Sequence, residues 1–190
     1  MKNIEVPKIN VKGDGSCFFY ALQTSMLGSS ASQEDCEVFG QLLRKEIVSY
    51  LEMHPDLLSD TAVANFCADL DGVGDLTASD NLIQMQIIFD KFLEHYSKKE
   101  TYADHFIVKL ATQMLGVNIV IVSNDRDIVI NSPDKPCDLT YYLYLQGEHY
   151  QSIPMTTDLY ELLQFTENFP GQVSGDGALM DFLRPVLVEA

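Results

Sequence analysis

A chain of 190 residues with 46% hydrophobic content is long enough to bury a sizeable core, which excludes an extended or disordered protein. The formal net charge of −16, with only 12 lysine and arginine residues, argues against a nucleic-acid partner, because phosphate binding depends on clustered basic side chains. A partner attracted by charge would be basic, although acidity also serves solubility alone.

The cysteines and the hydropathy pattern indicate the compartment. Cys17, Cys36, Cys67 and Cys137 form no C-x-x-C pair and have no histidine at metal-ligand spacing, so we expect neither a metal site nor disulfides. No basic, apolar leader opens the chain, and no apolar run is long enough to span a membrane. We therefore expect a cytoplasmic protein, or one in the host cytosol if it is a viral or bacterial effector.

The N-terminal part places a thiol between a turn and a helix. The alternating segment 4–11 predicts a short extended lead-in, and the glycines of Gly13-Asp14-Gly15-Ser16 favour a turn. Apolar residues from Phe18 to Met26 follow at helical spacing, which puts Cys17 in the first turn of a helix. The helix dipole and the free amides there predict a lowered thiol pKa and a reactive thiolate.

Four further helical regions fill the middle of the chain. Ser32 followed by Asp35 predicts an N-cap, with a helix that runs to about Met53 and ends at Pro55. Its predicted buried residues are Val38, Leu42, Ile47, Tyr50 and Leu51. Helical patterns also cover 62–69, 82–98 and 103–115, with a turn at 71–75 and a glycine C-cap at Gly116.

The period then changes to that of strands. The β-branched run 117–122 predicts a strand buried on both faces, followed by strands at 128–130, 139–145 and 149–153. The fold class is α+β, with a small central β-sheet packed between helices. We expect one domain at 1–155 and a C-terminal helical extension at 156–190. In that extension a helix at 158–169, an irregular stretch at 171–177 and an apolar tail at 179–188 dock on the same domain or on a partner.

Cysteine catalysis needs a base for the thiol proton, and imidazole suits that role at neutral pH. Of the four histidines, His54, His95 and His105 belong to helical regions, whereas His149 opens a strand after a tight turn and can be aimed across a cleft. The other three cysteines have acidic, apolar or proline-bounded surroundings and are predicted to be structural. The residues alone leave two readings of Cys17, a nucleophile or a buried small hydrophobe.

Three blocks in order resemble the ovarian tumour (OTU) family of cysteine deubiquitinases. The stretch Gly13 to Leu22 resembles the family's D-G-x-C nucleophile motif with its following Ala-Leu. The stretch 102–122 resembles its helix and central strand, and Gly147-Glu148-His149-Tyr150 resembles its histidine block. The resemblance implies a papain-like OTU domain.

The resemblance also implies roles for individual residues. Cys17 would attack the scissile carbonyl, His149 would be general base and then acid, and Asp14 would match the motif's aspartate. The backbone amides of Asp14, Gly15, Ser16 and Cys17 would form an oxyanion hole. Asp14 is also read as a residue that holds the turn through its own side chain.

Gln151 departs from the family pattern, which places Asn or Asp two residues after the histidine. A glutamine there either accepts a hydrogen bond from the imidazole and orients it, or is a strand residue that points to solvent. The orienting role could also pass to Asp14 or another acidic residue.

The resemblance implies a metal-independent and cofactor-independent cysteine peptidase that removes ubiquitin or a ubiquitin-like modifier. Its partners would be ubiquitin, polyubiquitin chains or such a modifier, and we expect a monomer. Acidic side chains such as Asp69, Asp71, Asp75 or Glu148 could pair with the arginines of the ubiquitin tail. Two alternatives are a catalytically weak ubiquitin-binding module with the same fold, and an unrelated cysteine acyltransferase.

Overall fold

The computed structural model describes residues 7–28, 31–58, 60–69, 82–123, 128–154 and 173–175. The helices are α1 (Cys17–Leu27), α2 (Gln33–Met53), the short 3-10 helix η1 (Pro55–Leu57), α3 (Asp60–Asp69), α4 (Leu82–Ser97) and α5 (His105–Leu115). The strands are β1 (Asn118–Ser123), β2 (Ile128–Asn131), β3 (Thr140–Gln146), β4 (His149–Ser152) and β5 (Val173–Gly175). The α+β class is confirmed. None of the helices in these ranges is long and apolar enough to cross a membrane.

The helix ends follow local capping signals. The Ser32 side chain accepts a hydrogen bond from the Asp35 amide at the start of α2, as the sequence predicts. Asp104 caps α5 by accepting from the Ile107 amide, and Gly116 ends that helix with a φ of 64°, in the left-handed region that favours glycine. These caps confirm the predicted boundaries to within two residues.

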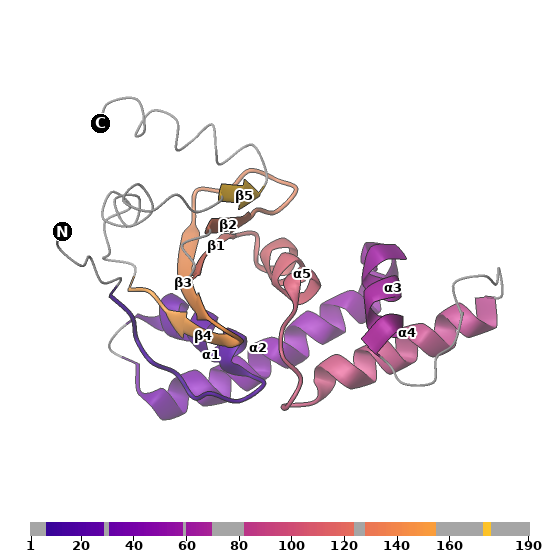
Figure 1. Cartoon of the computed structure of the whole chain (residues 1–190), viewed down its shortest axis with the longest axis horizontal. Helices are drawn as coiled ribbons and strands as arrows, with labels where there is room; N and C mark the ends of the chain where they lie inside the picture. The colour runs from indigo at the N-terminus through magenta and orange to yellow at the C-terminus, as the bar shows by residue number, and fades with distance from the viewer. Residues whose placement is uncertain are drawn as a thin grey trace.

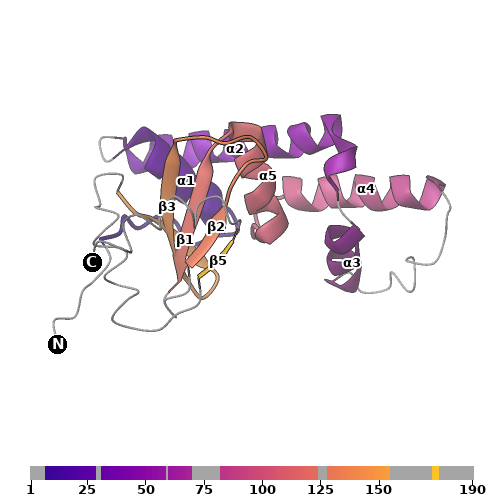
Figure 2. The ribbon, with the colours of Figure 1, turned by 90° about the horizontal axis from the view of Figure 1, so that it is seen from above.

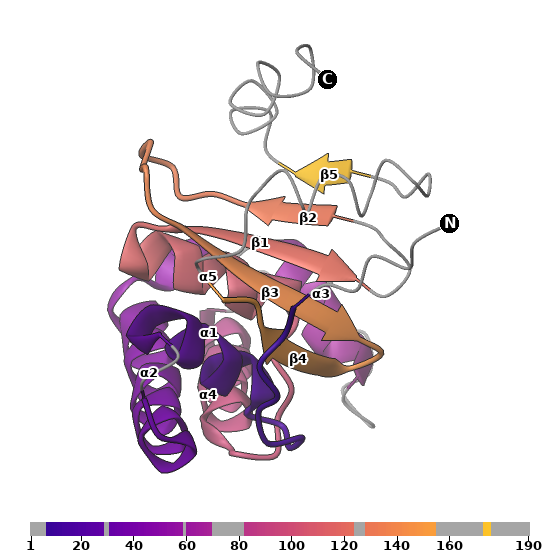
Figure 3. The ribbon, with the colours of Figure 1, turned by 90° about the vertical axis from the view of Figure 1, so that its left-hand side faces the viewer.

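The sheet has five strands in the order β4-β3-β1-β2-β5. Strand β1 pairs antiparallel with β2 and parallel with β3, and β3 pairs antiparallel with β4. Figure 3 shows this order from β5 at the top to β4 at the bottom. Beyond β4, Ile9 forms an isolated antiparallel bridge with Ser152, so the predicted lead-in segment borders the strand that carries His149.

Strand β5 corrects one prediction. The stretch 171–177 was expected to be irregular, but Val173–Gly175 pairs in parallel with β2. A strand of three residues in a glycine-rich stretch gives almost no periodic signal in the sequence. Pairing with the edge of β2 therefore defines this strand. The predicted helix at 158–169 and the tail at 179–188 lie outside the described residues.

The described helices that contact the sheet lie on one of its faces. Helix α1 packs on β3 and β4, and α5 packs on β1 and β2, as Figure 1 shows. Helices α2 and α4 run side by side and extend beyond the sheet, with α3 near their far end (Figure 2). Strand β1 is buried on both faces, as predicted, since Ile119 and Ile121 join the main core while Val120 and Val122 join a second cluster.

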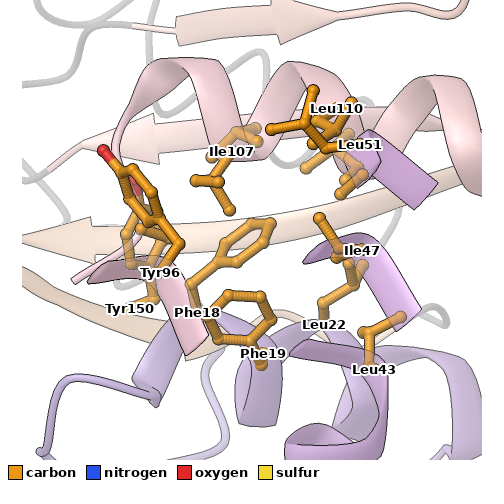
Figure 4. Close-up of a cluster of buried hydrophobic side chains, with 14 of the residues drawn as sticks. Phe18, Phe19, Leu22, Leu43, Ile47, Leu51, Tyr96, Ile107, Leu110 and Tyr150 are labelled. Carbon is orange, nitrogen blue, oxygen red and sulfur yellow. The ribbon is translucent and has the colours of Figure 1, made fainter. Parts of the chain in front are cut away.

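The main core sits between these helices and the sheet (Figure 4). Its labelled members are Phe18, Phe19 and Leu22 from α1, Leu43, Ile47 and Leu51 from α2, Tyr96 from α4, Ile107 and Leu110 from α5, and Tyr150 from β4. Each fully buried side chain of this size contributes about 1.5–3 kcal/mol to stability. The core therefore fixes α1, and with it Cys17, against β4.

One predicted helix face is wrong. Ile47 and Leu51 are buried, but Val38 and Leu42 are 55% and 46% exposed. The face of α2 that packs inward instead carries Cys36, Gly40, Leu43 and Arg44. Gly40 is needed there because α1 lies so close that a Cβ would meet the Tyr20 ring at 2.6 Å.

Candidate active site

The loop before α1 is a tight turn closed by Asp14. Its Oδ1 accepts a hydrogen bond from the Ser16 amide at 2.9 Å, and its carbonyl accepts from the Cys17 amide at 3.0 Å. An aspartate side chain that bonds the backbone two residues on is the physical basis of such turns. The turn-holding role of Asp14 is confirmed, and the turn delivers Cys17 to the first position of α1.

The Cys17 side chain lies beneath the start of β4. Its residue is only 1% exposed, and its Sγ donates to the Glu148 carbonyl oxygen at 3.7 Å. Burial raises the pKa of the Cys17 thiol, and hydrogen bonding from the Tyr150 and Phe18 amides offsets this only in part. The predicted lowering of this pKa by the helix terminus is therefore wrong, because desolvation outweighs the local amides.

His149 opens β4 beside the same loop. A Cβ at Gly13 would lie 3.7 Å from both Nδ1 and Cε1 of the ring, so the imidazole packs over the loop backbone. Its Nδ1 is buried, and no described residue hydrogen-bonds to it. The structure thus brings the predicted nucleophile and the predicted base to one turn, with a ring nitrogen left free for a proton.

The other histidines lie outside this turn. His54 packs on Tyr50 with ring centroids 4.5 Å apart. His95 packs edge-on against Phe66 at 5.4 Å and lines a groove together with Glu148 and Tyr150. His105 is exposed at the start of α5.

Gln151 lies on the same side of β4 as His149, because alternate residues of a strand share a face. It is 7% exposed, so the reading of Gln151 as a strand residue that points to solvent is wrong. Its Nε2 donates to the Asn10 side-chain oxygen, and its Oε1 is buried with no partner among the described residues. Sequence reasoning missed Asn10, which only the pairing of Ile9 with Ser152 brings to β4.

Charged groups surround the outer side of Asp14. Its Oδ2 lies 3.8 Å from Lys12 Nζ and 3.7 Å from Lys99 Nζ. Within the described residues its carboxylate has no hydrogen bond to His149, so its observed partners are those of the turn.

Two residues of α2 that were not predicted from the sequence hydrogen-bond to the loop. Gln41 Nε2 donates to Ser16 Oγ at 2.7 Å, and Arg44 Nη2 donates to the Gly15 carbonyl at 2.7 Å. The available signal was the position of Arg44 three residues before the buried Ile47, on the face of the helix that packs inward.

A groove of about 660 Å³ lies beside the β3–β4 turn, and neither Cys17 nor His149 is among the residues that line it. One wall is the segment 98–104, which joins α4 to α5, and the other is the β3–β4 turn with Leu145, Glu148 and Tyr150. Glu148 and Tyr150 also supply the backbone groups that hydrogen-bond Cys17. The groove is therefore connected to Cys17 through Glu148 and Tyr150, and its acidic lining residues are Glu100, Asp104 and Glu148.

Comparisons with known proteins agree with this geometry. The family profile described as OTU-like cysteine protease matches residues 12–150. A search of curated protein sequences gives no match. Among solved structures, the viral OTU domain protease from Farallon virus matches with a TM-score of 0.54 and 18% identity, covering 77% of this chain and 82% of that one.

Two other structures are similar to the same extent. The Hazara virus OTU bound to ubiquitin has a TM-score of 0.54 and 13% identity, over 80% of this chain and 82% of that one. An OTU deubiquitinase from Wolbachia pipientis wMel has a TM-score of 0.53 and 12% identity, over 86% of this chain and 98% of that one. These similarities show a shared fold.

The fold and the family profile define the class of cysteine peptidases. The chain belongs to the family of OTU-like cysteine proteases, whose profile covers the nucleophile loop, the groove wall and the histidine strand together.

Proposed function

We propose that this protein is a deubiquitinase that hydrolyses isopeptide or peptide bonds at the C-terminus of ubiquitin or a ubiquitin-like modifier. One observation carries the proposal. A buried thiol at a helix start bonds to the Glu148 carbonyl next to His149, the His149 ring packs on Gly13 of the loop that precedes the thiol, and Glu148 lines a groove.

The reaction follows from these groups. His149 takes the Cys17 proton, and Sγ attacks the carbonyl carbon of the terminal glycine to form a tetrahedral intermediate. When the C–N bond breaks, His149 returns the proton to the leaving amine. Water, deprotonated by the same imidazole, then hydrolyses the thioester and releases the carboxylate and the free thiol.

The loop amides supply the stabilisation of the oxyanion. The Ser16 and Cys17 amides already donate to Asp14 inside the turn. We expect the Asp14 and Gly15 amides to meet the oxyanion first, since neither has an acceptor among the described residues. Removing one such donor costs about 3–4 kcal/mol of barrier in enzymes of this kind.

Substrate binding must also release the Cys17 thiol from its hydrogen bond to the Glu148 carbonyl. Because burial raises the pKa of Cys17, the free enzyme holds a neutral thiol that is bonded to the Glu148 carbonyl. A peptide that enters the groove past Glu148 would exchange this contact for one with the substrate. Glu100 and Glu148 are placed to pair with arginines of a ubiquitin tail.

A ubiquitin derivative with a C-terminal electrophile tests the proposal. The wild type should form a covalent adduct, whereas Cys17→Ala should form none and His149→Ala should form it at least a hundredfold more slowly. If the wild type forms no adduct yet retains ubiquitin in a pull-down, the chain is a binding module with this fold. If it neither reacts nor binds, a modifier of another class or another acyl transfer must replace the proposal.

The extent of the catalytic unit and its location are also proposals. Residues 12–150, which match the family profile, fall within the predicted domain at 1–155. Strand β5 shows that part of the later chain adds to the same sheet. The four cysteines are free thiols, which fits a reducing compartment such as the cytosol.

A further inference from the structure

Arg44 lies in the middle of α2, and its side chain is turned inward. It is 1% exposed, and burial lowers its pKa to about 10, so the guanidinium is still charged at neutral pH. No carboxylate of the described residues forms an ion pair with it. A fully buried cation without an ion-pair partner is rare in proteins, and it calls for an explanation in terms of its contacts.

The contacts are carbonyl oxygens from two separate segments. Arg44 Nη2 donates to the Gly15 carbonyl at 2.7 Å and to the Thr101 carbonyl, also at 2.7 Å. Nη1 donates to the Tyr96 carbonyl at 3.0 Å. The planar guanidinium therefore joins the nucleophile loop to the groove wall through one rigid group.

The Ser16 hydroxyl forms a second connection between the same parts. Its Oγ accepts from Arg44 Nη2 at 3.1 Å and from Gln41 Nε2 at 2.7 Å, and it donates to the Lys99 carbonyl at 3.0 Å. The two backbones are in direct contact here, since a Cβ on Gly15 would lie 2.1 Å from the Glu100 carbonyl carbon. The loop thus has little freedom to shift relative to segment 98–104.

Stability alone gives no reason for an ion at this position. Replacing a buried ionic group by an apolar side chain of similar volume is often neutral or stabilising. The Phe19 ring, whose centroid is 4.2 Å from the guanidinium carbon, would accept an apolar neighbour equally well. What only a guanidinium supplies is the simultaneous geometry toward Gly15, Thr101 and Tyr96.

We propose that Arg44 is a positioning residue for Cys17, which fixes the loop Gly13–Ser16 against segment 98–104 so that the thiol and the loop amides stay aimed at the groove. The inference rests on the proposed function in that it takes Cys17 as the nucleophile. Arg44 does not itself line the groove, and its hydrogen bonds go to the loop and to the backbone of the groove wall, so its effect on the thiol must pass through the loop.

Arg44→Lys and Arg44→Met test this role. Lysine keeps the positive charge but lacks the planar guanidinium with its several donors. Methionine fills a similar space but has neither the charge nor the donors. Turnover of a ubiquitin C-terminal fluorogenic substrate should show kcat at least tenfold below the wild type, with KM within about twofold, because none of the side chains that line the groove is changed. Thermal melts establish that each variant is folded at the assay temperature, and if methionine prevents folding, the lysine variant decides.

The rate of alkylation by iodoacetamide measures how accessible and reactive Cys17 is, and the assay needs no ubiquitin. Releasing the loop should expose Cys17, so the variants should be alkylated at that residue at least fivefold faster than the wild type, with the midpoint of the pH–rate curve shifted to lower pH. Faster alkylation together with slower turnover is the expected signature. Wild-type alkylation rate and midpoint in a folded Arg44→Lys protein would overturn the inference.

Ile47→Ala is the matched control. It lies one turn further along the same buried face of α2, and no contact of its side chain with the loop is recorded among the described residues. It should lower the melting temperature yet leave kcat and the alkylation rate within twofold of the wild type. An equal loss of kcat in this control would show that Arg44 acts only through stability. If the wild type fails to process ubiquitin, the proposed substrate fails, and the alkylation arm still decides the role of Arg44.

Discussion

The side-chain amide of Gln151 donates a hydrogen bond to the side-chain oxygen of Asn10, which joins the N-terminal lead-in to the strand that carries His149. This bond uses the amide nitrogen and leaves Gln151 Oε1 buried without a partner among the described residues. Gln151 Oε1 lies on the face of β4 that also carries His149, so it is suited to accept a hydrogen bond from an imidazole N–H. Asn10 would then orient Gln151, and Gln151 would orient His149.

Gln151→Ala should therefore lower kcat about tenfold, the effect of one lost hydrogen bond of about 1.4 kcal/mol. Asn10→Ala should lower it less, about two- to threefold, because Gln151 remains in place but is no longer held. Steady-state turnover of a ubiquitin fluorogenic substrate measures both. Activity within twofold of the wild type in Gln151→Ala would show that another group orients His149.

Gly15→Ala should damage both stability and activity. The new Cβ would lie 2.1 Å from the Glu100 carbonyl carbon and oxygen, so backbone must move. Overpacking of this kind costs about 1–3 kcal/mol, and the displaced loop carries Cys17 with it. Gly13→Ala is the control for stability, since its Cβ would meet the His149 ring at an ordinary 3.7 Å. Thermal melts should show a clear drop for the first variant alone.

Alkaline pH should destabilise the fold through Tyr150. Burial raises the pKa of Tyr150 to about 12, whereas an unfolded tyrosine titrates near 10. The unfolded state thus loses its proton first, and stability falls as the pH rises from about 10 to 12, by up to about 2–3 kcal/mol. Urea unfolding at pH 8, 10 and 11 measures the decline. Tyr150→Phe, which cannot ionise, should show a smaller decline, and an equal one would place the effect on other groups.

Cys17 should be a slow thiol in the free enzyme. It is buried with a raised pKa, whereas Cys137 is partly exposed in the loop before β3. Limited iodoacetamide at pH 7 should therefore modify Cys137 before Cys17, as read by peptide mass spectrometry. A Cys137→Ser variant leaves the Cys17 rate to be measured alone. Faster labelling of Cys17 than of Cys137 in the wild type would mean that the thiol is ionised at rest.

The sequence predicts most elements of this fold because their signals are local. The Ser32 cap, the Gly116 stop and the β-branched run of β1 each depend on a few adjacent residues. The same holds for the turn that Asp14 closes. Motif order along the chain then identified Cys17 and His149 as a pair.

What the sequence could not supply depends on residues far apart. Arg44 is buried because it bonds carbonyls 52 and 57 residues further on, at the end of α4 and in the segment after it, and no local pattern indicates these contacts. The exposed Val38 and Leu42 share its helix, and hydropathy alone assigned them to the core instead. The raised pKa of Cys17 likewise comes from β4 lying over it, which no local reading of the helix start contains.

The separation along the chain between Cys17 and Glu148, whose carbonyl accepts its hydrogen bond, also has a consequence for biosynthesis. The carbonyl that accepts the Cys17 thiol proton comes from a residue 131 positions later. Contacts of such long sequence separation form late, after local helices have appeared. During translation the helix that carries Cys17 leaves the ribosome well before the strand that carries His149. On the proposed function, the nascent chain should therefore be inactive until β4 has joined the sheet, so that hydrolysis begins only in a molecule that has folded.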